Sequence, residues 1–382
     1  MNPTPATYAS PGAAPGYTWE ATSEAVAARY GVPLERIARF DMNTSPAAPA
    51  LAARILAEGR FEVPLSEYPP ADYRRLVDAA AARYGVGTDE LLVGAGADEV
   101  LDLVAKTWLP PGGTAVVPSP TYAMYRVSTE QRPAIVRDVP RLGPEAGYAL
   151  DAEATRLAAR GADLVWLCSP NNPTGLAEPD GLIPGLLAGL ADDAETSGRD
   201  APVVVLDEAY AEFAGSSLLE LRQAYPGLVV VRTLSKAYAL AGIRVGFAVA
   251  RPEVIARMEP YRPPGSLSVA SVAVGTAALL DDAVVDENLE RVVGERSRVA
   301  TALVEAGWRV GPSVTNFLLV DFGAPAAAEA AAEGLLRRGL VPRTFGPTHR
   351  LAAHLRLTVR DTEQDDRLID AACEMAQEGA TR

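Results

Sequence analysis

The sequence contains very few of the residues that build metal sites and disulfide frameworks. Its 382 residues include 2 cysteines and 2 histidines. Cys168 and Cys373 lie far apart in the chain, and His349 and His354 lie near its end. No zinc-ligand spacing and no disulfide framework can be assembled from this set. We therefore expect no metal site and a chain adapted to a reducing cytoplasm.

Positive charge and long apolar runs are also scarce. The chain has 35 lysines and arginines against 49 acidic residues, which gives a net charge of −14. Nucleic-acid binding requires basic surface, so we expect no nucleic-acid partner. No run approaches the roughly 20 apolar residues of a membrane helix. The first residues, "MNPTPATYAS", lack the basic region and apolar core of a signal peptide. These features predict a cytoplasmic protein without a membrane partner.

The chain does contain a regular series of short apolar runs. Its composition, 48% hydrophobic and 22% charged, is ordinary for a globular protein. The runs show little alternation, which is typical of parallel strands buried on both faces. They occupy residues 114–117, 163–168, 202–206, 227–231 and 246–250. Helix-period stretches such as 97–108 separate them. The pattern predicts an α/β fold, a mostly parallel sheet with helices on both faces.

The pattern changes after about residue 265. A long helical stretch at 269–307 is followed by the strand-like segments "TNFLLVDF" and "HLRLTV" and by a final helix. These elements predict a second, smaller α+β domain. Residues 1–18 are rich in Pro, Gly and Ala, and we expect them to be flexible. The predicted boundaries are an N-terminal arm at 1–40, a large domain at 41–265 and a small C-terminal domain at 266–382.

Chemically distinctive residues follow three of the apolar runs. Open parallel sheets bind ligands beyond the carboxyl ends of their strands, so these positions are the informative ones. "SPNNPTG" follows the run at 163–168, "DEAY" follows 202–206, and "RTLSK" follows 227–231. The three exits supply an asparagine, an acid with a tyrosine, and a lysine. We expect them to meet at one edge of the sheet.

Asp207 and Lys236 suggest specific chemistry at this edge. A carboxylate after "VVVL" should be partly buried, and a buried charge requires a cationic partner. A structural ion pair or a helix N-cap would explain Asp207 equally well. A lysine at a desolvated strand end can lose its proton and attack a carbonyl. An acid facing a ring nitrogen is what a pyridine cofactor requires as an electron acceptor.

A phosphate site is predicted beside these residues. "LLVGAGADEVLDL" has the pattern of a strand, a glycine turn and a helix start, whose free amides at Ala97, Asp98 and Glu99 would bind an anion. A tight turn with Asp98 as helix cap would also explain this stretch. Further phosphate ligands are available from Thr233, Ser235 and Arg244. Together the predicted groups describe an aldehyde cofactor that carries a phosphate and a pyridine ring.

The motifs resemble those of the fold-type I pyridoxal-phosphate aminotransferases, and within them the histidinol-phosphate group. The resemblance rests on "SPNNPTG", "DEAYAEF", "RTLSKAYALAGIRVG", "PTYAMY" and "LRLTV". It implies the cofactor pyridoxal 5'-phosphate. It also implies transfer of an amino group between histidinol phosphate and 2-oxoglutarate, a step of histidine biosynthesis.

The resemblance assigns roles around the cofactor ring. Lys236 matches the lysine that binds the cofactor aldehyde, and Asp207 matches the acid that pairs with the ring nitrogen. Asn172 and Tyr210 match the residues that hydrogen-bond the phenolic oxygen. Tyr122 matches the aromatic residue stacked on the ring, although an ordinary core tyrosine is the alternative. The residues that match the phosphate site are Ala97, Asp98, Thr233, Ser235 and Arg244.

Further matches concern the substrate and a second subunit. Arg356 matches the arginine that holds the substrate anion, and its alternation with leucines directs it away from them. A surface cation on an edge strand is the alternative. Arg343 matches a second substrate arginine, and Asn43 matches a substrate contact of the N-terminal segment. Tyr68 matches a tyrosine that reaches the neighbouring subunit's phosphate, which implies a homodimer with shared active sites.

The sequence departs from the family pattern at positions expected to face the substrate. "NTSP" at 43–46 and "RPPGS" at 262–266 replace the usual segments, and Arg360 replaces a glycine. Three alternatives therefore stay open: an aminotransferase for aromatic or other amino acids, a related decarboxylase of a phosphorylated amino acid, and a non-catalytic cofactor-binding regulator. The intact Lys236 argues against the regulator.

Overall fold

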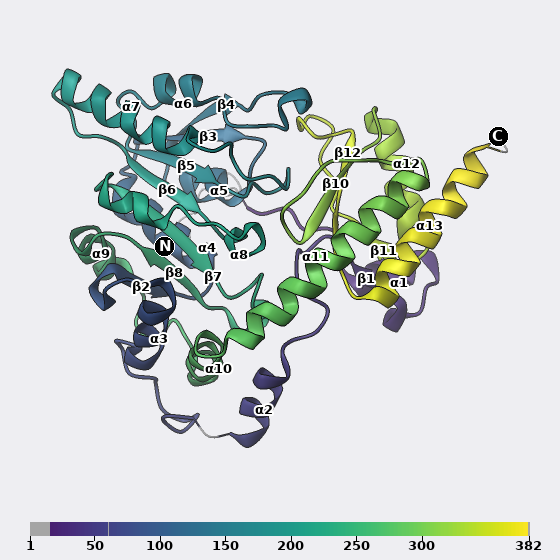
Figure 1. Ribbon diagram of the computed structural model, residues 1–382, viewed down its shortest axis with the longest axis horizontal. Helices are drawn as coiled ribbons and strands as arrows, with labels where there is room; N and C mark the ends of the chain where they lie inside the picture. The colour runs from purple at the N-terminus through teal and green to yellow at the C-terminus, as the bar shows by residue number, and fades with distance from the viewer. Residues whose placement is uncertain (1–15, 60, 381–382) are drawn as a thin grey trace, which may run out of the picture.

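The computed structural model describes residues 16–59 and 61–380. It consists of a large part built on a 7-stranded sheet and a smaller part built on a 3-stranded sheet. The long helix α11, Asp282–Glu305, runs from one part to the other (Figure 1). The first fifteen residues of the predicted arm lie outside the described residues.

The large sheet has the strand order β2-β8-β7-β6-β5-β3-β4. Its neighbours pair in parallel except at β8. Its strands are β2 Leu91–Gly94, β3 Thr114–Ser119, β4 Ile135–Pro140, β5 Leu164–Cys168, β6 Val203–Asp207, β7 Leu228–Thr233 and β8 Gly246–Val249. The mostly parallel α/β sheet predicted from the apolar runs is confirmed.

Strand β8 corrects one detail, because it runs antiparallel to both β2 and β7. A parallel crossover needs a dozen or more residues and usually a helix. Between β7 and β8 the chain forms only the 3-10 turn Ala241–Ile243 as regular structure. The connection therefore contains no helix that could carry a parallel crossover. The edge strand β4 was not predicted, because its side chains are mostly exposed and it lacks a continuous apolar run.

The central strands are buried on both faces, as their unbroken apolar runs predict. In β6, Val204 and Leu206 contribute to one hydrophobic core, and Val205 contributes to the other. The first core is covered by α3 Arg74–Tyr84, α6 Ala152–Ala158, α7 Leu182–Ser197 and α10 Val269–Leu279. The second core is covered by α4 Ala97–Trp108, α5 Met124–Glu130 and α9 Pro252–Met258. The sheet therefore lies between two layers of helices (Figure 1).

The smaller part is an antiparallel sheet packed against helices. Its strands are β9 Arg309–Val310, β10 Phe317–Asp321 and β12 His354–Thr358, and its helices include α12 Pro325–Leu336 and α13 Thr362–Ala380. Leu355 and Leu357 enter its core, so Arg356 between them points to the other side. None of the described helices is long and apolar enough to cross a membrane.

The N-terminal residues 23–40 pack with this smaller part. Helix α1, Ser23–Tyr30, contacts α12 through a 2.6 Å hydrogen bond from Tyr30 to Glu333. Strand β1, Ala38–Arg39, pairs in parallel with β11, Leu340–Val341. Two helices extend the large part: α2 Ala50–Glu58, whose Ala52 joins the first core, and the short α8 Ala211–Ala214. We propose that residues 23–40 fold with the C-terminal domain and that α10 belongs with the large one.

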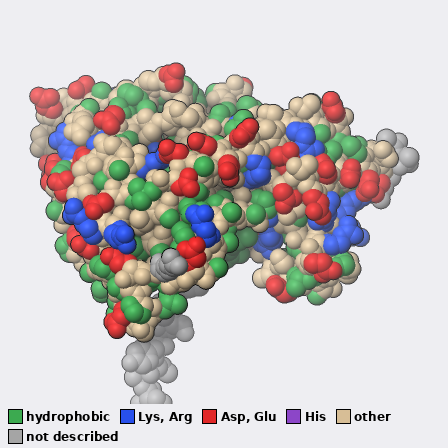
Figure 2. All heavy atoms as spheres, turned by 60° about the horizontal axis from the view of Figure 1, so that its bottom comes forward, with side chains coloured by type: hydrophobic (Ala, Val, Ile, Leu, Met, Phe, Trp, Pro, Cys, Tyr) green, Lys and Arg blue, Asp and Glu red, His purple; other side chains and the backbone are tan. Residues whose placement is uncertain are grey.

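Charged side chains of both signs are spread over the molecule. On the face shown in Figure 2, acidic and basic side chains are interspersed over both parts. The surplus of acidic over basic residues is a property of the whole sequence. This face offers no continuous basic stripe to a polyanion.

Candidate active site

A cavity of about 660 Å³ lies where β5, β6 and β7 end, between the large sheet and the smaller part. Strand ends and the start of α4 form its floor, and arginines from the smaller part form one side. The sequence-predicted residues that line it are Asn43, Ala97, Asp98, Tyr122, Asn172, Asp207, Tyr210, Thr233, Ser235, Lys236, Arg244, Arg343 and Arg356. Residues from distant parts of the chain therefore meet at the edge of the sheet that we predicted from the residues following three strands.

Lys236 presents its amine to this cavity just beyond the end of β7. Its Nζ donates a 3.3 Å hydrogen bond to the backbone oxygen of Asn43 and lies 5.8 Å from the centre of the Tyr210 ring. Burial, reinforced by the positive charge of Arg356, lowers the pKa of the amine from 10.5 to about 8. The amine therefore loses its proton, and becomes nucleophilic, at a lower pH than an ordinary lysine.

Asp207 is the last residue of β6 and is buried. Its Oδ2 accepts a 2.8 Å hydrogen bond from the Tyr125 hydroxyl, and its Oδ1 accepts a 3.0 Å bond from the Ala209 amide. Burial raises the pKa of the carboxyl from 3.8 to about 6, although these hydrogen bonds oppose the shift. The carboxyl faces the cavity that Lys236 also lines.

The structural ion pair considered as one explanation of Asp207 is not formed among the described residues. No lysine or arginine nitrogen of the described residues lies within 4.0 Å of Asp207. Two neutral donors, a hydroxyl and an amide, replace the cation that the sequence argument required. The carboxylate is therefore available to a positively charged group that enters the cavity.

A polar network joins the side chains above the cavity floor. Asn43 donates from Nδ2 to the Tyr210 hydroxyl at 2.9 Å. Arg356 donates to Oδ1 of Asn172 at 2.6 Å and to the backbone oxygen of Asp41. Asn43 has a left-handed backbone, with φ of 52°, and its amide bonds to Thr358 on β12. The network fixes Tyr210 and Asn172 from the side of the smaller domain.

The predicted phosphate site lies at the start of α4. Ala97 and Asp98 line the cavity there, together with Thr233, Ser235 and Arg244. The Thr233 and Ser235 hydroxyls are 3.0 Å apart, and Arg244 reaches Asp98 at 3.4 Å. Free amides at a helix start and adjacent hydroxyls and a guanidinium are the groups that bind a phosphate.

Two glycines allow close packing around this helix start. A Cβ on Gly246 would lie 2.4 Å from the carbonyl carbon of Gly96 and 2.5 Å from the amide of Ala97. Gly96 itself has φ of +82°, and a Cβ there would meet the Arg244 guanidinium at 2.4 Å. Only glycine permits the helix start, β8 and Arg244 to approach this closely.

Glu99 and Tyr68 do not line the cavity. Glu99 points back, with one oxygen accepting from the Ala95 amide at 2.6 Å and the other from Ser266 at 3.1 Å. Its carboxylate therefore stabilises the turn before α4. Tyr68 is 87% exposed in the single chain and lies beside Gly265.

Tyr122 lies at the cavity wall and is anchored by its hydroxyl. The hydroxyl donates to Oδ1 of Asp98 at 2.9 Å, and the ring packs edge-on against Tyr125, 5.7 Å away. Burial raises the pKa of the phenol well above its usual value, so the hydroxyl stays protonated. The ring is therefore held in place beside the cavity rather than free to rotate away.

The two arginines differ in how they are held. Arg356 is buried, and its Nε has no hydrogen-bond partner among the described residues. Arg343 pairs backbone to backbone with Arg356 and donates from Nη1 to the oxygen of Thr18 at 2.8 Å. Glu20 lies 3.5 Å from the same nitrogen. Arg356 is thus not the surface cation considered as its alternative.

The sequence argument missed several residues that shape the site. Tyr17 and Trp19 line the cavity, although we expected residues 1–18, and with them Tyr17, to be flexible. The Tyr17 ring lies under the Arg343 guanidinium at 5.1 Å and 6.4 Å from the Tyr122 ring. Their aromatic character within a Pro- and Ala-rich stretch was the available signal. Tyr125, which holds Asp207, belongs to the quoted "PTYAMY" motif but was assigned no role.

The fold and the sequence have clear relatives. The sequence profile of the aminotransferase class I and II family matches residues 61–371. The histidinol-phosphate aminotransferase of Roseiflexus castenholzii is 36% identical over 94% of this chain and 95% of its own length. That of Symbiobacterium thermophilum is 38% identical over 88% of this chain and 90% of its own length.

A solved structure shows the same fold. It is the histidinol-phosphate aminotransferase of Sinorhizobium meliloti in complex with pyridoxal-5'-phosphate. The two chains superpose with a TM-score of 0.84 at 24% identity, over 94% of this chain and 96% of the other. The profile match and the relatives above 30% identity agree with the cavity geometry. This chain belongs to the aminotransferase class I and II family.

Proposed function

We propose that this protein is a pyridoxal-phosphate-dependent aminotransferase that moves an amino group between histidinol phosphate and 2-oxoglutarate. One observation carries the proposal: the low-pKa amine of Lys236 and the cation-free carboxyl of Asp207 line the same cavity. The substrate assignment is supported by relatives of 32% to 38% identity that bear the name histidinol-phosphate aminotransferase.

The residues present fit pyridoxal phosphate. Asp207 lacks a cation, and the protonated ring nitrogen of the cofactor is one. The close packing at Gly96 and Gly246 holds the start of α4 at the cavity, where its free amides suit the phosphate. Asn172 and Tyr210 would hold the phenolic oxygen, and Tyr122 would lie against the ring.

The protein side chains would each perform one task. When bound, the cofactor supplies an aldehyde and an electron-accepting ring. Lys236 offers an amine that can bind covalently and afterwards carry a proton to and from the substrate carbon. Asp207 keeps the proton on the ring nitrogen, which preserves the electron-accepting character of the ring. Asn43 and Arg356 orient Tyr210 and Asn172 through the network above the floor.

The arginines and aromatic rings define the space for the substrates. Histidinol phosphate has no carboxylate, so its phosphate must use the guanidinium that otherwise holds 2-oxoglutarate. The planar fork of arginine can pair with either anion. Arg356 lines the cavity, with its terminal nitrogens bonded to Asn172 and Asp41 and its buried Nε without a hydrogen-bond partner among the described residues. Tyr17 and Trp19 provide flat apolar surface, which suits an imidazole ring.

The departures from the family pattern affect the cavity less than expected. Arg360 is buried, donates to the oxygen of Thr44 and to Gln364, and does not line the cavity. Ser266 bonds to Glu99 instead of facing the cavity. Asn43 and Thr44 do line it, so "NTSP" is the departure that a substrate would meet.

A second candidate is an aminotransferase for aromatic amino acids. The specific observation in its favour is the aromatic wall of Tyr17, Trp19 and Tyr122, which would accept a phenyl ring as well as an imidazole. The two candidates differ in whether the amino donor carries a phosphate or a carboxylate.

A panel of amino donors with 2-oxoglutarate distinguishes these candidates. We expect histidinol phosphate to give the highest kcat/KM. Arg356→Ala should lower kcat/KM for histidinol phosphate and for 2-oxoglutarate by about a hundredfold, the cost of leaving an anion unpaired. Arg343→Ala should lower it mainly for the phosphorylated donor. A higher kcat/KM for phenylalanine or tyrosine, unchanged by Arg343→Ala, would favour the aminotransferase for aromatic amino acids.

We also infer a homodimer in the cytoplasm. The exposure of Tyr68 supports shared sites, since a tyrosine 87% exposed in one chain is free to reach another. The thiols support a reducing compartment, because Cys168 and Cys373 are both free and Cys373 is exposed.

A further inference from the structure

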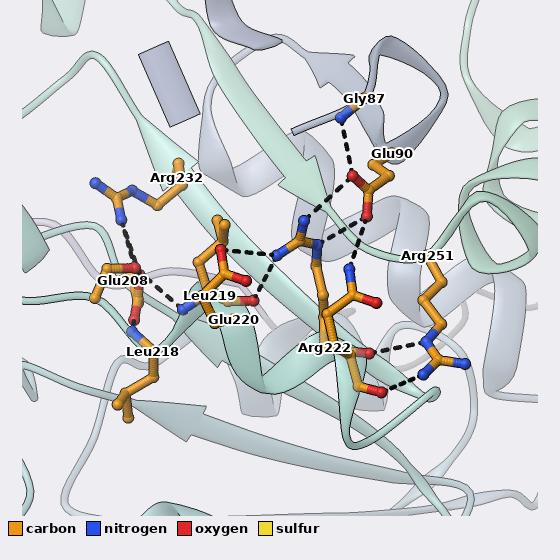
Figure 3. Close-up of polar contacts among 11 residues, drawn as sticks. Gly87, Glu90, Glu208, Leu218, Leu219, Glu220, Arg222, Arg232 and Arg251 are labelled. Carbon is orange, nitrogen blue, oxygen red and sulfur yellow. Dashed lines mark hydrogen bonds and ion pairs between the residues drawn. The ribbon is translucent and has the colours of Figure 1, made fainter. Parts of the chain in front are cut away.

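A cluster of buried charges lies directly behind the strand ends that carry the candidate catalytic residues. Side chains alternate along a strand, so neighbours of cavity-lining residues point to the opposite face. Asp207 and Thr233 face the cavity, whereas Glu208 and Arg232 face the layer that contains α3. Figure 3 shows Arg232 directed at the Glu208 carboxylate.

The charged side chains of the cluster are almost completely removed from water. Arg232 donates from Nη1 to Glu208 at 2.8 Å and from Nη2 to Glu212 at 2.7 Å. The side chains of Arg232 and Glu208 are 8% and 2% exposed. Glu208 also accepts from the Ser217 hydroxyl at 2.5 Å and from the Leu218 amide at 2.6 Å. We call Arg232, Glu208, Glu212 and Ser217 the rear clamp.

The rear clamp links three elements that lead into the cavity floor, β6, β7 and α8. Glu208 follows β6, Arg232 belongs to β7, and Glu212 lies in α8, whose N-cap is Tyr210. A displacement of β6 relative to β7 would have to break buried charge-assisted bonds, which is costly because an unpaired charge would remain. The clamp therefore resists the movement that would separate Asp207 from Lys236.

We propose that the rear clamp is a positioning device for the aminotransferase reaction, acting through Asp207, Tyr210 and Lys236 without touching a substrate. The inference rests on the proposed function. Groups on separate strands must hold one geometry, and a misplacement of about 1 Å can reduce a rate by about a hundredfold. A guanidinium fork that bonds two carboxylates fixes direction as well as distance.

A second buried ion pair, between Arg222 and Glu90, provides a matched control. Arg222, in the 3-10 helix η4 Leu219–Gln223, donates from Nε to Glu90 at 2.9 Å (Figure 3). This pair is also buried, with side chains 4% and 13% exposed. Neither residue adjoins a cavity-lining residue in sequence. The Arg222–Glu90 pair therefore matches the rear clamp in chemistry and burial. It differs because its residues are not sequence neighbours of the residues that line the cavity.

The test compares Arg232→Lys, Glu208→Gln and Ser217→Ala with Arg222→Lys and Glu90→Gln in the full-length protein. Each is measured for its thermal unfolding midpoint and for the Kd of pyridoxal phosphate, from quenching of tryptophan fluorescence. The rate of amino transfer from saturating donor and the KM complete the set. Lysine keeps the charge of residue 232 but lacks the fork.

We expect Arg232→Lys to lower the saturated rate about tenfold or more, with KM changed less than about twofold. Ser217→Ala should act in the same direction more weakly, and it decides the matter if Arg232→Lys does not fold. Arg222→Lys should lose comparable thermal stability and keep its rate within about twofold. The proposal would be overturned if the clamp variants and the control variants lost equal amounts of rate. It would also be overturned if the clamp variants lost stability and kept their rate. If the wild-type protein binds the cofactor but transfers no amino group, the proposed function is overturned instead. The Kd of pyridoxal phosphate would then still distinguish the clamp variants from the control variants.

Discussion

At the scale of single residues, the buried amine of Lys236 combines a functional role with a cost to stability. Its pKa of about 8 lies below the ordinary 10.5. Below pH 8 the amine is charged in the folded and unfolded protein alike, so burial destabilises the fold fully. Between these two values the folded protein loses its proton first, so stability rises with pH.

Lys236→Met should therefore abolish amino transfer by at least about a thousandfold and yet raise the unfolding midpoint of the cofactor-free protein at pH 7. The difference from wild type should shrink as the pH rises from about 8 toward 10.5. Calorimetry across this range measures it. A variant less stable than wild type at pH 7 would show that the amine is well solvated.

Tyr125 is the residue whose role the structure reveals most clearly. Its hydrogen bond opposes the burial that raises the pKa of Asp207 to about 6. A carboxylate with a raised pKa is charged only above that value. In Tyr125→Phe the pKa should rise further, so Asp207 would remain protonated, and unable to hold a cationic ring, to higher pH.

We expect Tyr125→Phe to bind pyridoxal phosphate about threefold to tenfold more weakly than wild type. As the pH is lowered, its affinity should begin to decrease at a higher pH than that of wild type. Titrations between pH 5 and 8 measure this. The ring still stacks on Trp166, 5.3 Å away, so folding should be preserved. Tyr225→Phe, which removes a buried hydroxyl bonded to Pro202, is the control. Coincident pH profiles for all three proteins would contradict the assignment.

At the scale of elements, the contact between β8 and the start of α4 decides where the helix amides lie. A Cβ on Gly246 would meet backbone atoms of Gly96 and Ala97 at 2.4 Å and 2.5 Å. Backbone cannot turn aside as a flexible side chain can, so the helix start must move. Gly246→Ala should displace the amides from the phosphate site.

We expect Gly246→Ala to lose about 1–3 kcal/mol of stability and to weaken cofactor binding about tenfold or more. Gly294→Ala in α11 is the control, because a Cβ there meets nothing within 4 Å. Alanine in a helix is favoured over glycine, so this control should gain about 0.5–1 kcal/mol. Thermal unfolding and cofactor titration measure both. If Gly246→Ala kept its cofactor affinity, the amides at the start of α4 would not be the phosphate ligands.

At the scale of the whole molecule, the proposed dimer makes a prediction for an exposed side chain. Tyr68 does not line the cavity of its own chain. If its hydroxyl reaches a partner's cofactor phosphate, Tyr68→Phe should weaken cofactor affinity about threefold to tenfold without changing the dimer mass. Sedimentation equilibrium and cofactor titration test this together. Tyr261→Phe, at 48% exposure, is the control. A fully active monomer would contradict shared sites.

The arrangement of the whole molecule also shows which features were open to prediction. Unbroken apolar runs predict strands buried on both faces, because only a two-sided core tolerates them. The ends of parallel strands share an edge, so Asn172, Asp207 and Lys236 could be placed together from sequence order alone. The helix start at Ala97 followed from its turn glycines and its apolar period.

Other features depended on contacts between distant segments. Sequence had no local signal that β8 would reverse or that Tyr125 would reach Asp207 across 82 positions. Arg343 and Arg356 enter the cavity because the smaller domain packs against the sheet edge. The amino acids determined which groups were available, since residue type sets charge, size and local propensity. The tertiary structure decided which of them meet and which pKa values shift, because distance and burial arise only when the chain has folded.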